Sequence, residues 1–178
     1  MILSLFRRRR KGEDIEPLYG AIMAAGLDPA LYAEHGVADS FEGRFEAVTL
    51  AAAIALHRLK GEPPPADAAA QQLVDRIFDG LDSAMREVGI SDPGIPRRMK
   101  KFAQGFYGRL GAYSQALDQT ERRAALAAAI QRNLLDGRTP TPGLIDHVEA
   151  LAGRIAAPGL DDFLAGRWSG RAQEGQSQ

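Results

Sequence analysis

The residues with the best spacing for metal chemistry are three aspartates, Asp75, Asp79 and Asp82. On a helix they stand at i, i+4 and i+7, so their carboxylates share one face, as Mg²⁺-binding aspartates do in isoprenoid synthases. Those enzymes use closer pairs of carboxylates and a second acidic motif on a facing helix, and neither pattern occurs here. Asp82 also precedes Arg86 by four residues, the spacing of an ordinary surface ion pair. We therefore predict a solvated helix face and no metal site. A lyase or synthase would require these aspartates to face inward around a pocket.

Histidine and cysteine give no better basis for catalysis. His35, His57 and His147 are far apart in the sequence, and none has a second metal ligand at helical spacing. The chain contains no cysteine, which excludes disulfides, thiolate nucleophiles and cysteine-ligated metal centres. A glycine-rich phosphate loop after a strand, a nucleophile elbow and a zincin motif are also missing. We predict that the protein is not an enzyme and uses no cofactor or small-molecule substrate.

A cluster of cations near the N-terminus is better suited to binding than to catalysis. It follows a short apolar segment, MILSLF, at Met1–Phe6, and it consists of Arg7, Arg8, Arg9, Arg10 and Lys11. This order fits a peripheral anchor on an anionic membrane, but consecutive arginines also suit ribosomal RNA phosphates, and a basic tail without either role is the third interpretation. No apolar run approaches the roughly 20 residues that cross a bilayer. The interpretation is a cytoplasmic protein, with peripheral contact at the inner face of the cytoplasmic membrane left open.

A second cluster of cations lies in the segment PRRMKKFAQGFYGRLGAYSQAL, residues 96–117. Its apolar residues recur at helical spacing and predict one helix of roughly 33 Å, which we call the spine helix. The apolar stripe consists of Ile95, Met99, Phe102, Phe106, Leu110, Tyr113 and Leu117. The opposite side carries Arg97, Lys100, Lys101, Gln104, Gly108, Gly111 and Gln115.

That polar side weakens the isolated spine helix. Cations in a first turn cost up to about 1 kcal/mol each, and a glycine costs about 1 kcal/mol relative to alanine. In one interpretation, another helix packs closely on the glycines and the cations pair with nearby acids such as Glu87 or Asp92. In the other, this side of the spine helix binds a partner.

The composition predicts an all-α fold. The 178 residues include 45% hydrophobic and 25% charged residues, with many alanines and few β-branched residues. We expect a single compact, bundle-like domain of about six to eight helices. Helical patterns cover residues 17–26, 28–32, 41–59, 66–88, 96–117, 121–135 and 144–155, and a terminal turn follows at 160–168. Residues 1–14 are expected to form a basic tail, 15–168 the helical domain, and 169–178 a disordered tail.

The distribution of charge bears on the class of partner. The formal net charge is −1, but without Arg7–Lys11 there are 17 basic residues against 23 acidic ones. A mildly acidic body disfavours broad affinity for nucleic acid phosphates. A helical module that binds ribosomes or nucleic acid through Arg7–Lys11 and residues 97–101 is therefore the alternative rather than the leading hypothesis.

Several blocks between residues 18 and 117 point to a family. The most specific is FYGRLGAY at Phe106–Tyr113, separated by one residue from SDPGIPRRMKKFAQ at 91–104. The others are Leu18-Tyr19-Gly20, the run His35–Ser40 with Gly43–Glu46, and Phe78-Asp79 with Arg86–Gly89. In this order they resemble the ubiquinol-cytochrome c chaperone family, assembly factors of respiratory complex III.

The resemblance implies a non-enzymatic chaperone that binds newly made cytochrome b during assembly of the cytochrome bc complex. Another complex III subunit, a second assembly factor and the ribosome are further partners that it leaves open. We expect the client or partner to contact Arg97, Lys100, Lys101, Tyr107 and Arg109. The polar framework that the resemblance assigns consists of Tyr19, Asp39, Arg44, Arg86, Glu87 and Asp92.

Overall fold

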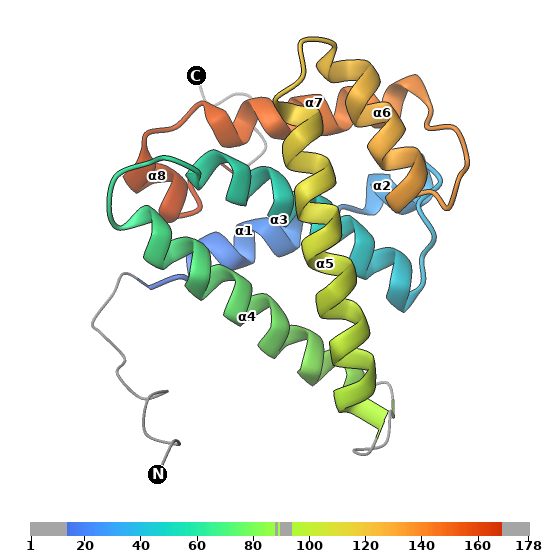
Figure 1. The fold of residues 1–178 in the computed structure, drawn as a ribbon, viewed down its shortest axis with the longest axis horizontal. Coiled ribbons are helices and arrows are strands. Elements are labelled where there is room, and N and C mark those ends of the chain that lie inside the picture. Colours follow the sequence, from blue (N-terminus) through green and yellow to red (C-terminus); the bar gives the residue numbers. More distant parts are fainter. Residues whose placement is uncertain (1–13, 88, 90–93, 169–178) are drawn as a thin grey trace, which may run out of the picture.

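The computed structural model describes residues 14–87, 89 and 94–168, and within them every regular element is a helix. This confirms the all-α prediction. The elements are α1 (Glu16–Gly26), α2 (Pro29–Ala33), α3 (Phe41–Leu59), α4 (Ala66–Glu87), α5 (Ile95–Leu117), α6 (Arg122–Asn133), α7 (Pro142–Ala156) and α8 (Leu160–Leu164). The spine helix is α5. Figure 1 shows it crossing in front of α3.

Side-chain caps fix where several helices begin. The Ser40 hydroxyl accepts a hydrogen bond from the Gly43 amide at 3.1 Å and starts α3. The Asp28 carboxylate does the same at α2, and the Thr141 hydroxyl does so at α7. Each cap satisfies an amide that has no partner inside its own helix. The first residues of α2, α3 and α7 are thus fixed by the side chain that directly precedes each helix.

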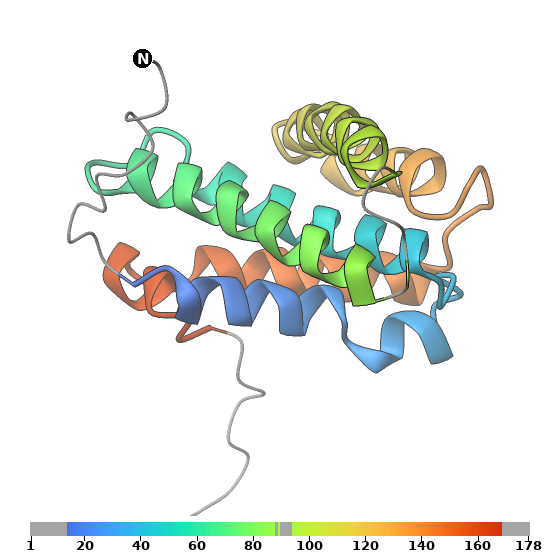
Figure 2. The same cartoon turned by 90° about the horizontal axis from the view of Figure 1, so that it is seen from below.

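Helix α3 lies at the centre of the domain. It contacts α1, α4, α5 and α7, and Figure 2 shows α5 and α6 on one side of it with α1 and α7 on the other. Every residue from Ala47 to Ala55 is buried. Within this stretch α3 has no exposed side, because neighbouring helices surround it. A Cβ on Gly26 of α1 would lie 2.6 Å from the Val48 Cα atom, so glycine permits a close crossing of α1 and α3.

The apolar stripe of α5 packs as predicted. Ile95, Phe106 and Tyr113 are buried, and the remaining members of the stripe are partly buried against the core. The Phe106 ring meets Phe78 of α4 edge to face, with 5.2 Å between ring centroids. The Phe102 ring lies 4.5 Å from that of Phe45 in α3. One side of α5 is thus fixed to α3 and α4, which leaves the other side open.

The C-terminal segment, which includes α8, packs against α1. Phe163 and Trp168 are buried, and their rings stack with centroids 6.0 Å apart. Gly166 has a positive φ of 69°, and a Cβ there would lie 2.6 Å from the Pro17 carbonyl oxygen. The chain can therefore turn tightly over the start of α1. One hydrophobic cluster extends from Leu18 to Trp168, which makes these helices a single domain.

Candidate partner-binding site

Four cations line the first two turns of α5. Arg97, Arg98, Lys100 and Lys101 are all exposed and border a shallow hollow together with Gly94 and Gln104. Among the described residues, none of the four forms an ion pair. We call these four residues the basic face. The structure therefore presents concentrated positive charge to solvent at this end of the domain.

Tyr107 and two glycines continue this surface along α5. Tyr107 is 57% exposed, which is unusual for a large aromatic residue. Gly108 and Gly111 are exposed, and a Cβ on either would have nothing within 4 Å outside its local helix. The expectation that another helix packs on these glycines is wrong for this part of the chain. Binding of a partner on this side stays a prediction.

Arg109 lies further along α5 than the basic face. Its guanidinium forms an ion pair with the Glu46 carboxylate of α3, and the two side chains are only 28% and 15% exposed. Burial raises the pKa of Glu46, and the nearby Arg109 charge partly opposes that shift. Arg109 thus fastens α5 to α3 and is set apart from the basic face with which the sequence had grouped it. Glu46 had not been singled out as its partner.

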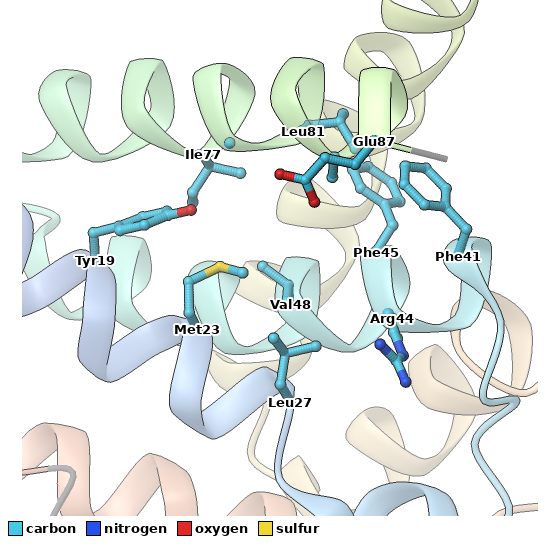
Figure 3. A pocket seen from close by; sticks show the side chains of 12 residues that line it. Tyr19, Met23, Leu27, Phe41, Arg44, Phe45, Val48, Ile77, Leu81 and Glu87 are labelled. Atoms are coloured by element: carbon cyan, nitrogen blue, oxygen red, sulfur yellow. The ribbon is translucent and has the colours of Figure 1, made fainter. Parts of the chain in front are cut away.

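The second surface feature is an apolar hollow between α1, α3 and α4, with a volume of about 290 Å³. Figure 3 shows Met23 near its middle, with Ile77 and Leu81 above and Phe41 and Phe45 at one end. We call it the apolar groove. Its lining consists of Tyr19, Met23, Leu27, Phe41, Arg44, Phe45, Val48, Ile77, Gly80, Leu81, Ala84 and Glu87.

Three residues of the predicted polar framework, Tyr19, Arg44 and Glu87, line this groove. The Tyr19 ring lies under the Arg76 guanidinium, 4.1 Å from its carbon atom, and the hydroxyl occupies the space that Gly80 leaves by lacking a Cβ. Arg44 forms a 2.7 Å ion pair with Asp39, a fourth member of the framework. The Glu87 carboxylate extends over the groove (Figure 3). The family resemblance and the geometry thus indicate the same region.

The other two framework residues do not belong to this group. Arg86 pairs with Asp82 on the exposed side of α4, at 2.8 Å. Asp92 lies outside the described residues, as do Arg7, Arg8, Arg9, Arg10 and Lys11. The predictions for those six positions are therefore untouched by the structure. No helix of the described chain has the length and apolar character needed to cross a membrane.

The three aspartates of α4 do not surround a pocket. Asp75 and Asp79 are exposed, and Asp82 is held by Arg86. At 100° per residue, all three lie on the side of α4 turned away from the apolar groove. The inward-facing arrangement that a lyase or synthase would need is thus contradicted. In the part of the chain that the structure describes, no three acidic or histidine side chains are grouped to hold a metal ion.

The three histidines, which are far apart in the sequence, make contacts between distant segments. His35, before α3, and His147, in α7, meet edge to face with ring centroids 5.4 Å apart. Burial lowers the pKa of His147, so the neutral imidazole is favoured there. His57 of α3 instead contacts the Ser114 hydroxyl of α5, with its Nδ1 atom 3.0 Å away. These contacts join helices and suggest a structural role.

Comparisons with known proteins bear directly on the family. Residues 33–171 match the family described as ubiquinol-cytochrome C chaperone. The fold matches the crystal structure of the Cbp3 homolog from Brucella abortus with a TM-score of 0.74 and 38% sequence identity, over 93% of this chain and 94% of that one. A search of curated proteins found no match. The family match covers most of the chain and confirms the resemblance: this protein belongs to the ubiquinol-cytochrome C chaperone family.

Proposed function

We propose that this protein is a non-catalytic assembly chaperone of the cytochrome bc complex that binds newly made cytochrome b through the basic face and Tyr107. Family membership supports the class of function. We choose this surface because its four adjacent cations are exposed and have no acidic partner among the described residues. Such charges are free to pair with carboxylates of a client.

The geometry of α5 suits a helical client such as cytochrome b. Gly108 and Gly111 leave the backbone of α5 uncovered, so a partner helix can approach it closely. Tyr107 adds a large exposed ring beside them, of the kind that is enriched at protein interfaces. The basic face would bind acidic groups of a client segment. The exposed side of α5 from Tyr107 to Gly111 would contact an apolar part of the same segment.

Charge reversal at Arg97, Lys100 and Lys101 tests the proposal. A triple glutamate variant should leave circular dichroism unchanged, because exposed charges contribute little to stability. At Arg97 the change even favours the helix, since an acid in the first turn complements the macrodipole. In a host that depends on this protein, the same variant should lower the amount of complex III in reduced-minus-oxidised spectra. It should also retain less newly made cytochrome b in affinity purification of the full chain.

A matched control separates the basic face from net charge. Arg122, Arg132 and Arg154 are exposed cations on α6 and α7 that form no ion pair among the described residues, and their joint reversal changes the net charge equally. We expect normal complex III in this control. Normal complex III in the basic-face variant would contradict the assignment of the surface, and normal complex III after deletion of the gene would contradict the chaperone function itself.

The ribosome-binding alternative rests on the same unpaired cations, which also suit phosphates. Co-sedimentation with ribosomes at increasing salt distinguishes the two. If the basic-face variant loses ribosomes but retains cytochrome b, the alternative is favoured.

A further inference from the structure

The apolar groove leaves a substantial hydrophobic surface without a partner in the described chain. Leu27, at its edge, is 38% exposed, and among the described residues only Tyr107 is another large hydrophobic residue with such high exposure. Met23 lies in the middle of the lining, and its flexible thioether can adapt to an irregular apolar segment. A groove of this kind favours occupation by an apolar chain.

One end of the groove also carries a charge. Glu87 reaches over the apolar lining and has no ion-pair partner within the described residues, whereas Arg44, the other charged residue of the lining, is already paired with Asp39 (Figure 3). An apolar segment that carries a cation next to it would therefore satisfy both parts of the groove.

The chain itself contains such a segment. Met1–Phe6, MILSLF, is apolar, and it is followed immediately by four arginines and Lys11. We propose that this N-terminal segment folds back into the apolar groove of the same molecule, with Met1–Phe6 on the apolar lining and Arg7 at Glu87. This inference does not rest on the identity of the client.

The length of the intervening chain permits this arrangement. The described structure begins at Asp14, next to α1, and the groove is lined by Tyr19 and Met23 of that helix and by Leu27 directly after it. Helix α1 is about 15 Å long, whereas residues 7–14 extend up to about 23 Å. Arg7 can therefore reach the far end of the groove, and Met1–Phe6 can return along it.

Docking of the tail gives the domain two states. In solution the segment covers the groove. On an anionic membrane the arginines and the apolar residues transfer to the lipid surface, which has the chemistry to hold both. Contact with an anionic membrane therefore uncovers the groove.

Disulfide trapping in the full chain, with diamide added as the two-electron oxidant, tests this inference, because the chain has no cysteine of its own. One variant carries Leu5→Cys with Leu27→Cys, at the groove. The matched control carries Leu5→Cys with Asp75→Cys, on the opposite side of α4. Position 75 is adjacent to Arg76, whose guanidinium bonds to Glu16, so the control cysteine is well within reach of the tail.

We expect the intramolecular disulfide to form roughly tenfold faster at position 27 than at position 75, since docking raises the effective concentration of the tail there. Glu87→Lys should remove most of that difference. Vesicles of phosphatidylserine and phosphatidylcholine should slow the reaction at position 27, and vesicles of phosphatidylcholine alone should not.

Three results would overturn the inference. Equal rates at the two positions would mean that the tail has no preference for the groove. Disulfide-linked dimers would mean that the segment binds a second copy rather than its own molecule. An unchanged rate with anionic vesicles would contradict release at the membrane. Circular dichroism of each variant checks that the fold is intact.

Discussion

Replacing Arg109 by methionine tests whether this residue joins α5 to α3. The Arg109 and Glu46 side chains are largely shielded from water, so the substitution leaves a carboxylate without its cation in a poorly solvated position. Two unit charges 4 Å apart attract by about 4 kcal/mol at an effective dielectric constant of about 20. Relief of the desolvation of arginine offsets part of this loss. We expect the free energy of unfolding to fall by about 2–3 kcal/mol.

This loss should depend on pH. Burial holds the pKa of Glu46 above its ordinary value, and Arg109 opposes the shift, so removing Arg109 raises the folded-state pKa further. A carboxyl whose pKa is higher in the folded than in the unfolded state binds protons on folding. The free energy of unfolding of the variant is therefore lowered most at pH values above the folded-state pKa. Its penalty fades as the pH falls through that value toward the ordinary pKa of 4.5.

Urea unfolding at pH 7.5 and pH 5 measures this difference for the wild-type chain and Arg109→Met. The loss should be smaller at pH 5. A double variant, Glu46→Gln with Arg109→Met, should recover much of the stability at pH 7.5, because no uncompensated charge remains. Equal losses at both pH values, or no loss at all, would refute a structural ion pair and return Arg109 to the set of candidate client contacts.

Three further predictions concern the core, the helix crossing and the tail. Phe106→Ala should lower the free energy of unfolding by about 3–5 kcal/mol in denaturant titration, since the ring is fully buried; a loss below 1 kcal/mol would contradict the packing of α5. Gly26→Ala should cost about 1–3 kcal/mol because its Cβ would meet the Val48 backbone, whereas Gly20→Ala, in open space on the same helix, should stabilise by up to about 1 kcal/mol. Equal thermal shifts for these two variants would exclude a close crossing. Deletion of residues 1–11 should abolish weak, salt-sensitive sedimentation with anionic vesicles at low salt, and unchanged binding would contradict the anchor.

Much of the fold could be predicted because local signals agree with it. The apolar stripe of α5 is a pattern of neighbouring residues, and the helix that it predicts occurs where the sequence indicated. The central position of α3 was missed because alanine suits every face of a helix. Its many alanines gave no clear contrast between a buried and an exposed side.

The candidate site was less predictable, since its contacts join distant segments. Nothing local associates Glu46 with Arg109, or His35 with His147. The apolar groove did leave a signal in α1. Leu18, Ala21 and Ile22 form its buried face, while Tyr19, Met23 and Leu27 form a second apolar row at i, i+4 and i+8. A short helix with two apolar rows has more hydrophobic surface than one core contact requires.

The alanine-rich centre of α3 affects how mutational scans of this protein should be interpreted. From Ala51 to Ala53 the side chains are single methyl groups enclosed by neighbouring helices. Scanning by alanine replacement cannot probe these positions at all, and the scan would report its largest effects at the bulky residues around them. The centre is instead vulnerable to enlargement, because each added carbon must displace a whole helix rather than fill a void. Loss-of-function alleles at this helix should therefore consist mainly of small residues exchanged for larger ones, such as alanine to valine or threonine.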